Sequence, residues 1–486
     1  MSKKEPSIKL NFGMNALLTL TSIIFPIISF PYVSRVLLPE GTGKVSFAVS
    51  LITYFVMLSQ LGIPTYGIRA CARVRDDREE LSRVTHELLF ISLIMSLVSY
   101  LLLFALIFFI PRLYSEKTLY YITSLMIIFG AIGAEWLYKG LEQYTFITIR
   151  SVICKVIALI AMLLLIRERS DYLIYGAITV FAGSAPGLIN FICAGRYISF
   201  KPVGGYDIKR HLKPVMVFFA MSCATTIYTH LDTVMLGFMT NDTEVGYYNA
   251  AVKIKAVLVS LVTSLGAVLL PRASYYIEQG NFSKFVDISR KAFYFVLSVS
   301  VPLILYFILF AKESINFISG PAFSGSIAPM QIIMPTLLFI GITNIIGIQM
   351  FIPLGKEKVV LLSVIVGAVV DVIVNIILIP GYASAGAAAG TTIAEVAVLI
   401  VQVVALRRYF REKNPGFSVM AFLGKLHILY ILPASLISLA ASLWVKMLNL
   451  NSFFTLAISS CLFFGIYGII FWSQWKKIGI KGIEEK

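Results

Sequence analysis

The stretch VVLLSVIVGAVVDVIVNIILI, residues 359–379, is an almost uninterrupted apolar run in which Asp371 is the one ionisable side chain. Crossing the hydrocarbon core of a bilayer, roughly 30 Å thick, takes about 20 such residues in an α-helix. The run is also much longer than the alternating segments of about ten residues that mark transmembrane β-strands. It therefore predicts a membrane-spanning helix, because only helices and closed barrels satisfy every backbone group in lipid.

Runs of this kind recur along the whole chain. Of its 486 residues, 58% are hydrophobic and 14% are charged, and the mean hydropathy is +0.87. Soluble domains are roughly 45–50% apolar and 25% charged. The predicted spans are residues 10–32, 42–63, 85–110, 119–138, 145–166, 172–194, 215–239, 247–270, 292–310, 328–354, 359–379, 387–406, 426–445 and 453–472. The expected fold class is an all-α integral membrane protein with about 14 transmembrane helices.

The distribution of lysine and arginine predicts the orientation. Most of the 41 Lys and Arg residues fall in alternate loops that include both chain ends, and cytoplasmic loops carry the excess of these residues. Both termini are therefore expected to be cytoplasmic. The first apolar run, which no small-residue cleavage site follows, is expected to be retained as a helix. The net charge of +16 is then a consequence of topology and does not indicate nucleic-acid binding.

Sequence motifs of soluble enzyme chemistry are missing. The chain has no phosphate-cradling P-loop, dinucleotide-binding fingerprint, HExxH motif or nucleophile elbow, so ATP is not expected to be the direct fuel and no cofactor is expected. The five cysteines have no metal-binding or redox spacing and are interpreted as packing residues. Loops between spans are too short for an extramembrane domain of ordinary size. Function is therefore expected within the helical bundle.

A weak internal repeat predicts two lobes. Gly43, Leu61, Gly62 and Arg69 recur about 203 residues later as Gly246, Leu265, Gly266 and Arg272. The offset covers six spans, so the repeats would enter the membrane in the same direction, as in transporters that rock two lobes around a midplane site. The expected parts are a six-helix N-terminal lobe (1–195), a cytoplasmic loop (196–213), a six-helix C-terminal lobe (214–413), and two additional helices with a basic tail (414–486). Two long inner loops, 64–84 and 271–291, are expected to be helical along the membrane surface.

Ionisable side chains inside the spans indicate where a site lies. Placing such a group at the bilayer centre costs at least about 2.5–3.5 kcal/mol, so these residues usually face the interior and mark a transport pathway. The candidate substrate-binding residues are the cations Arg150, Lys155 and Lys253 with the polar stripe Asn15, Thr19 and Ser22, and the candidate ion-coupling residues are Asp232, His230 and Glu395.

Each candidate also has a structural interpretation. Arg150 lies near enough to the cytoplasmic side for its charged group to snorkel to the surface, whereas Lys155 is too deep for that and its alternative is an internal salt bridge. For Asp232 the alternative is a structural pair with one of the lysines, and for Glu395 it is a contact between helices. A lone histidine such as His230 is more often a packing residue. A GxxxG motif, residues 386–390, predicts close helix packing.

Several strings in chain order give the sequence a family resemblance. They are FPYVSRVLLPEGTGKVSF (30–47), LSQLGIPTYGIR (58–69), HLDTVMLGF (230–238), EVGYYNAAVKI (244–254), IGIQMFIPLGKEK (346–358) and NIILIPGYASAGAAAGTTIAE (375–395). With them the chain resembles, over its whole length, the Wzx-type polysaccharide (repeat-unit or O-antigen) flippases of the multidrug/oligosaccharidyl-lipid/polysaccharide exporter superfamily.

This resemblance implies two six-helix lobes around a cavity that opens alternately to either side of a bacterial plasma membrane. It implies a cargo of oligosaccharide linked through pyrophosphate to a polyprenol, moved from the inner to the outer leaflet. The implied partners are membrane lipids, this lipid-linked oligosaccharide, and polysaccharide polymerase and glycosyltransferases. Cationic side chains suit such a diphosphate, because charge-assisted contacts to phosphate are strong.

Other functions stay open at this stage. Lipid II or a teichoic-acid precursor shares the lipid diphosphate end, and a drug/cation antiporter shares the superfamily, although its sites usually favour acids. A membrane glycosyltransferase or polymerase would be expected to carry a large outer loop, and the outer loops here are short. Proton coupling, sodium coupling and the membrane potential are all open as the driving force.

Overall fold

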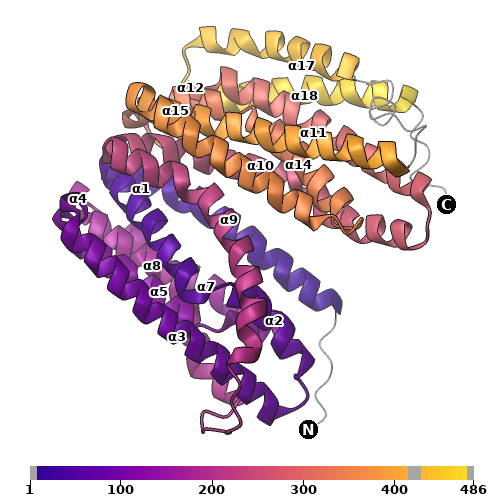
Figure 1. Cartoon of the computed structure of the whole chain (residues 1–486). Coiled ribbons are helices and arrows are strands. Elements are labelled where there is room, and N and C mark those ends of the chain that lie inside the picture. The colour runs from indigo at the N-terminus through magenta and orange to yellow at the C-terminus, as the bar shows by residue number, and fades with distance from the viewer. Residues whose placement is uncertain (1–7, 414–427, 479–486) are drawn as a thin grey trace. The chain divides into compact units, whose positions relative to one another are not determined.

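The computed structural model describes residues 8–413 and 428–478, and within these ranges the chain forms helices and no β-strand (Figure 1). The helices of the first half are α1 (Ile8–Gln60), α2 (Ile63–Arg73), α3 (Arg78–Phe109), α4 (Pro111–Ser115), α5 (Lys117–Ile132), α6 (Glu135–Gly140), α7 (Tyr144–Leu165), α8 (Tyr172–Cys193) and α9 (Lys209–Met239). Those of the second half are α10 (Asp242–Glu278), α11 (Phe282–Leu309), α12 (Ala311–Ile318), α13 (Ile327–Ile333), α14 (Thr336–Asn344), the π-helix η4 (Ile345–Phe351), α15 (Glu357–Lys413), α17 (Ile428–Leu443) and α18 (Ser452–Ile478). Short 3₁₀ turns are η1 (Arg169–Asp171), η2 (Ala194–Arg196), η3 (Pro321–Ser326) and η5 (Trp444–Leu448). The predicted all-α class is confirmed for the described residues.

Many of these helices are long enough to cross a membrane. Within the described ranges, 11 helices have the length and apolar composition of a span, or 12 if the bent pair at residues 321–333 and 336–351 is one span. Two of them, α1 with 53 residues and α15 with 57, are far longer than the roughly 20 residues one crossing needs. The predicted number of about 14 follows if each of these two crosses twice. That number and the cytoplasmic termini stay predictions.

Both long helices contain a residue that is not helical. In α1 this residue is Leu38, with φ 58° and ψ −179°, and in α15 it is Ala383, with φ 46° and ψ −124°. Pro39 follows Leu38, and a proline ring disfavours the α conformation of the residue before it. The two breaks lie between the predicted spans 10–32 and 42–63 and between 359–379 and 387–406. They therefore mark the positions where the sequence predicts the chain to turn.

Two predicted spans are interrupted in the structure. The span predicted at 119–138 is divided between α5 and α6, where Ala134 adopts the left-handed conformation with φ 40°. Next to the break, a Cβ atom on Gly133 would lie 2.9 Å from the Cα atom of Gly187 in α8, so the backbones approach closely here. The span predicted at 328–354 is divided between α13 and α14 at Pro335 and is bent by 46°. The two breaks lie about 200 residues apart, at corresponding places in the predicted repeat.

The chain divides into two compact units, residues 1–246 and 247–486. In unit 1, α1 packs against α3, α5, α7 and α9, while α5 packs on α8 and α2 on α6. In unit 2, α11 packs against α14 and α17, α13 packs on α15, and α17 packs on α18. The Tyr306 hydroxyl of α11 bonds the Ser459 hydroxyl of α18 at 2.9 Å, which ties the last helix to this unit. The lobe boundaries expected from the sequence stay a prediction.

Helices also form where the sequence predicts surface helices. Residues 64–84 contain most of α2 and the first turns of α3, and residues 271–291 contain the end of α10 and the start of α11. Beyond its polar first turns, α3 presents large apolar side chains outward, among them Leu101, which is 63% exposed, and Phe109, which is 76% exposed. Such a face is stable in contact with lipid rather than water.

Candidate functional site

The structure brings Lys155 of α7 together with Ser22 of α1. The Lys155 ammonium donates a hydrogen bond to the Ser22 hydroxyl over 2.7 Å, and that hydroxyl donates in turn to the Leu18 carbonyl at 2.8 Å. Near this pair, the Thr148 hydroxyl of α7 donates to the Met14 carbonyl of α1 at 2.9 Å. These contacts fix α7 along the N-terminal half of α1. Two of the predicted substrate-binding residues are therefore direct partners.

The polar stripe on α1 faces away from the protein core. Asn15, Thr19 and Ser22 are all exposed, and the Thr19 hydroxyl is bonded to the Asn15 carbonyl four residues earlier at 3.0 Å. Their backbone groups are satisfied within the helix, so the amide of Asn15 and the outer lone pairs of the hydroxyls are available to a ligand. A row of this kind can hydrogen-bond polar cargo such as sugar hydroxyls.

Arg150 is the most deeply buried of the predicted cations in unit 1. Its side chain is 4% exposed, and Nη2 donates to the Glu135 carboxylate of α6 over 2.9 Å. The second oxygen of Glu135 binds Lys139 at 2.9 Å. The Nε and Nη1 atoms of Arg150 are buried and make no hydrogen bond. In this conformation the guanidinium is paired inside the unit and does not reach the surface.

The charges around Arg150 favour an anion. Glu135 is shared between Arg150 and Lys139, so the cluster keeps an excess of positive charge even before Lys155 is counted. A buried donor without a partner costs about 1–3 kcal/mol, and such groups in native proteins usually mark a bound water or ion. The free Nε and Nη1 atoms lie on different edges of the guanidinium, so each needs an acceptor of its own, and two separate phosphate oxygens would be suitable acceptors.

Sequence reasoning missed Glu135. It lies inside the apolar run 119–138, so the rule that singled out the other intramembrane charges applies to it as well. Its role becomes visible only with the break at Ala134, because α6 begins at Glu135 and directs its carboxylate to Arg150.

The candidate ion-coupling residues of α9 point in different directions. Asp232 is buried at 5% exposure, whereas His230 is partly exposed and its Nδ1 atom lies 3.4 Å from the Ser50 hydroxyl of α1. Two residues along a helix are turned by about 200°, so the two side chains cannot share one face. On the exposed side of the same helix, Thr225 bonds back to the Met221 carbonyl at 3.1 Å. Unit 1 therefore does not join Asp232 and His230 into one titrating pair.

In unit 2 the candidate residues lie on α10 and α15. Lys253 is partly exposed, and Glu395 is buried at 4% exposure. One turn from Glu395, the Thr391 hydroxyl lies 2.9 Å from the Tyr248 hydroxyl and joins the two helices. A Cβ atom on Gly390 would lie 2.1 Å from the Asn375 Oδ1 atom, so the predicted close packing at this glycine motif is confirmed.

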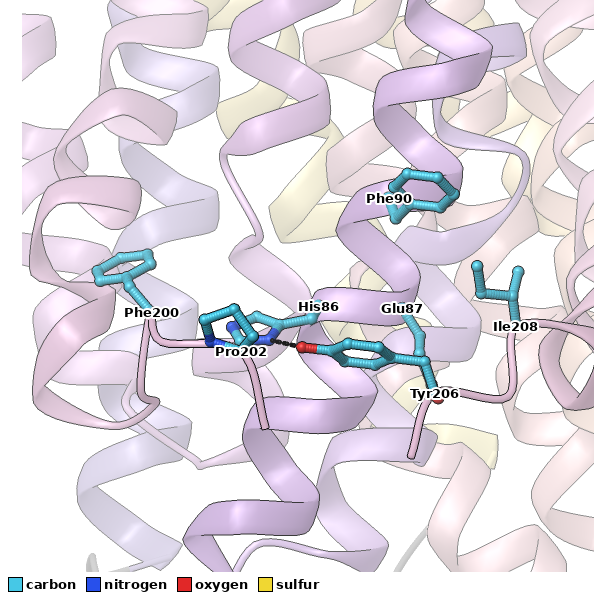
Figure 2. A pocket seen from close by; sticks show the side chains of 7 residues that line it. All are labelled: His86, Glu87, Phe90, Phe200, Pro202, Tyr206 and Ile208. Atoms are coloured by element: carbon cyan, nitrogen blue, oxygen red, sulfur yellow. Dashed lines mark hydrogen bonds between the residues drawn. The ribbon is translucent and has the colours of Figure 1, made fainter. Parts of the chain in front are cut away.

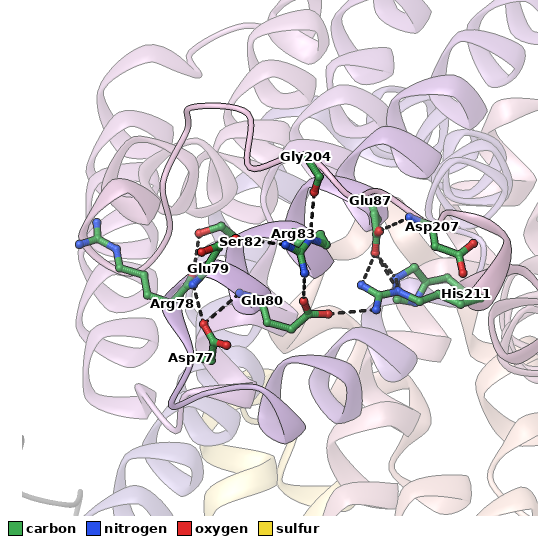
Figure 3. A network of polar contacts seen from close by, with 11 residues as sticks. Asp77, Arg78, Glu79, Glu80, Ser82, Arg83, Glu87, Gly204, Asp207 and His211 are labelled. Atoms are coloured by element: carbon green, nitrogen blue, oxygen red, sulfur yellow. Dashed lines mark hydrogen bonds and ion pairs between the residues drawn. The ribbon is translucent and has the colours of Figure 1, made fainter.

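A second polar network, which sequence reasoning missed, joins α2, α3 and α9. Figure 3 shows its contacts between α3 and α9. The buried Glu87 carboxylate accepts from Arg210 Nη2 at 2.7 Å and lies 2.7 Å from His211 Nε2. The other nitrogen of His211 lies 2.8 Å from the Tyr66 hydroxyl. Arg210 also binds Glu80 at 2.9 Å. The only signal in the sequence was an acid two residues into the predicted span 85–110, and its partners lie more than 120 positions away.

Across the described ranges, no group of three or more His, Cys, Asp or Glu side chains is placed to hold a metal ion. The buried thiols of Cys71 and Cys154 lie in helices and are not paired as a disulfide.

Comparison with known proteins identifies the family. A family model described as "Polysaccharide biosynthesis protein" matches residues 8–276, and a model described as "MatE" matches residues 218–377. Two proteins named "Putative O-antigen transporter" are similar. That of Escherichia coli (strain K12) is 21% identical over 74% of this chain and 86% of its own length, and that of Shigella dysenteriae is 24% identical over 79% and 96%.

Solved structures show the same fold. The lipid II flippase MurJ, in an inward closed conformation, aligns with a TM-score of 0.73 at 17% identity, covering 95% of this chain and 99% of its own. An inward-facing multidrug resistance MATE family transporter aligns with a TM-score of 0.60 at 11% identity, covering 83% and 99%. The chain therefore shares its fold with these two transporters. Because the first family model covers more than half of its length, this chain belongs to the polysaccharide biosynthesis protein family.

Proposed function

We propose that this protein is a flippase that moves a polyprenyl-pyrophosphate-linked oligosaccharide from the inner to the outer leaflet of a bacterial plasma membrane by alternating access. The family membership and the O-antigen transporter relatives support a lipid-linked polysaccharide precursor as the class of cargo. In this proposal the diphosphate binds the cations, the sugars meet the hydroxyl stripe of α1, and the lipid tail stays in the bilayer.

One observation carries the assignment of the diphosphate site. Arg150 is buried beside a single shared carboxylate, and two of its guanidinium nitrogens lack a partner. Lys155, five residues further along α7, holds its ammonium on a neutral hydroxyl and not on an acid. A cationic cargo would be repelled from such a cluster, whereas a diphosphate would be neutralised by it. This distinguishes the proposed flippase from a drug/cation antiporter.

The membrane potential supplies a driving force of the right sign. Moving two negative charges outward across an inside-negative potential of about 100 mV releases about 4.6 kcal/mol of free energy, at about 2.3 kcal/mol per charge. Exchange of a proton or sodium ion, with Asp232, His230 and Glu395 as candidates, is a further part of the proposal. In this scheme Lys253 is the cation that the second unit contributes to the cargo.

The test is flipping of a fluorescent polyprenyl-diphosphate oligosaccharide in proteoliposomes, comparing the wild type with Lys155→Ala. Lys291→Ala is the matched control, because Lys291 is an exposed lysine on α11 and is not one of the candidate site residues. We expect transport by the wild type and by the control, and loss of at least tenfold in Lys155→Ala at equal protein incorporation.

Other outcomes separate the alternatives. Unchanged transport in Lys155→Ala would keep the function and remove this residue from the site. Transport of lipid II or a teichoic-acid precursor, but not of the oligosaccharide lipid, would change the cargo. Failure with every lipid diphosphate, together with export of an organic cation, would replace the proposal by a drug antiporter.

A further inference from the structure

The segment between η2 and α9 is strapped onto the first turns of α3 (Figure 3). Its contacts, all within unit 1, include Arg78 Nη2 to the Ile198 carbonyl at 3.4 Å, Ser199 N to the Ser82 hydroxyl at 2.9 Å, Arg83 Nε to the Gly204 carbonyl at 2.9 Å, and Asp207 N to the Glu87 carboxylate at 2.6 Å. Side chains of α3 therefore satisfy backbone groups along the whole segment, which we call the strap (residues 197–208). The strap is a built surface rather than a free loop.

Between the strap and α3 lies a half-open pocket of about 420 Å³ (Figure 2). Its lining is His86, Glu87, Phe90, Phe200, Pro202, Tyr206 and Ile208. The Tyr206 hydroxyl lies 3.1 Å from His86 Nδ1, and the Glu87 carboxylate is engaged by Arg210, His211 and the strap. The polar groups of the lining thus have partners within the protein, so the surface left to an occupant is mainly aromatic and aliphatic. Its volume falls within the range of about 300–1,000 Å³ found for small-molecule sites.

The pocket is continuous with the apolar face of α3. Phe90 is 51% exposed, and Ile94 and Leu97, one and two turns further on, are 46% and 62% exposed. On the strap, Phe200 is 52% exposed. An apolar chain can therefore run from the pocket along α3 without crossing a polar barrier. Hydrocarbon rather than water is the stable filling of such a pocket, because it covers apolar surface.

Cations lie next to the lining residues of this pocket in the sequence. Residues 196–213 contain Arg196, Lys201, Lys209, Arg210 and Lys213, against Asp207 as their only acid. Lys201, between the lining residues Phe200 and Pro202, is exposed, as is Lys209 beside Ile208. Arg210 is already committed to Glu87 and Glu80. This charge would complement a phosphate next to an apolar tail.

We propose that the strap and α3 form a binding site for an anionic phospholipid, with an acyl chain in the Phe90–Phe200 pocket and the phosphate at Lys201 and Lys209. The site is separate from the cargo cluster on α1 and α7, and it does not depend on what the protein transports. It rests on the predicted cytoplasmic orientation of the strap, because the cytoplasmic leaflet carries the anionic lipids. Each lysine near such a surface contributes about 1 kcal/mol, which corresponds to about a fivefold change in occupancy.

The test is photo-crosslinking in proteoliposomes of equal parts phosphatidylglycerol and phosphatidylcholine. The full chain carries a photoactivatable phenylalanine analogue in place of Phe200, and lipid adducts are counted by mass spectrometry. We expect phosphatidylglycerol adducts to exceed phosphatidylcholine adducts at least fivefold. Equal yields would overturn the proposal, because they would show contact with bulk lipid only.

Two charge variants sharpen the test. Lys201→Ala with Lys209→Ala should bring the phosphatidylglycerol and phosphatidylcholine adduct yields close to equality, because each lysine contributes a factor of about five. The control Lys284→Ala with Lys291→Ala removes the same charge from exposed positions at the start of α11 and should leave the preference unchanged. An equal loss in both pairs would mean that overall charge attracts the lipid, which would overturn a specific site. A polyprenyl diphosphate added before irradiation in equimolar amount could instead prevent formation of the phosphatidylglycerol adduct. That result would assign the pocket to the cargo tail and would also overturn the proposal.

Discussion

Gly43 of α1 lies against Gly246 of α10 at a crossing where the two backbones are in direct contact. A Cβ atom on Gly43 would lie 1.7 Å from the Asp242 carbonyl oxygen and 2.9 Å from Gly246 N. A Cβ atom on Gly246 would lie 2.1 Å from the Pro39 carbonyl oxygen. These two glycines are the ones that the sequence repeat made equivalent. The predicted repeat therefore has the same small residue on both sides of one helix crossing.

Adding a methyl group at this crossing should separate the helices. In Gly43→Ala the new atom meets backbone, which cannot rotate away, so we expect a loss of about 1–3 kcal/mol in the free energy of unfolding and reduced transport. The measurement is thermal unfolding in detergent together with the flipping assay. Gly183→Ala in α8 is the control, because its Cβ atom meets nothing within 4 Å and the change should stay within about 0.5 kcal/mol. Equal effects of the two variants would contradict a tight crossing.

Next to this crossing, Arg112 of α4 clamps the turn between α9 and α10. Its Nη1 atom donates to the Thr240 carbonyl at 2.8 Å, its Nη2 atom binds Asp242 at 2.7 Å, and its guanidinium lies 5.1 Å from the centre of the Phe47 ring. Both charged side chains are about one quarter exposed, so solvent screens the pair only in part.

We predict a measurable coupling between Arg112 and Asp242. In a double-mutant cycle of Arg112→Ala and Asp242→Asn, the interaction free energy should be about 0.5–3 kcal/mol, and amide exchange at residues 240–246 should accelerate in either single variant. The exposed pair Arg408 and Glu412 of α15 serves as the comparison and should couple by less than about 0.5 kcal/mol. If the effects of the two single variants are additive, the interaction free energy between Arg112 and Asp242 is zero and the prediction is wrong.

The network around Glu87 should contribute strongly to the stability of unit 1. Glu87→Gln keeps the size of the side chain but removes the charge shared by Arg210 and His211, so we expect a loss of about 1–3 kcal/mol in the free energy of unfolding. Glu79→Gln, which removes a largely exposed partner of Arg83, should cost within about 0.5 kcal/mol. The measurement is thermal unfolding of both variants under the same conditions. A smaller loss of unfolding free energy in Glu87→Gln than in Glu79→Gln would contradict a stabilising role of the network.

Asp232 offers a test of ion coupling. If it carries the coupled proton or sodium ion, Asp232→Asn should abolish the dependence of transport on pH or on sodium while binding of the lipid diphosphate persists. The control is Asp287→Asn in α11, because Asp287 is 55% exposed and pairs with Arg290 three residues along the same helix. Flipping rates measured across pH and sodium gradients give the answer. An Asp232→Asn protein with the same gradient dependence as the wild type would remove this residue from the coupling site.

The membrane fold could be predicted from the sequence because the bilayer constrains it so strongly. Long apolar runs must become helices in lipid, so the all-α class and the positions of most spans followed from local composition. The interruptions at Ala134 and Pro335 did not follow. A straight helix and a broken helix can have the same apolar sequence pattern. The break at Ala134 lies where Gly133 contacts Gly187 of another helix, and local composition does not predict that contact.

The candidate site likewise has features that the sequence predicted and features that only the structure shows. Sequence alone singled out Lys155 and the stripe with Ser22, since an intramembrane cation and a polar face at helical spacing are local patterns. Only the tertiary structure decided that these two residues are partners, that Glu135 neutralises part of Arg150, and that Glu87 lies between Arg210 and His211. A side chain's depth and charge are set by its own helix, whereas its partner is set by the packing of helices that lie far apart in the chain.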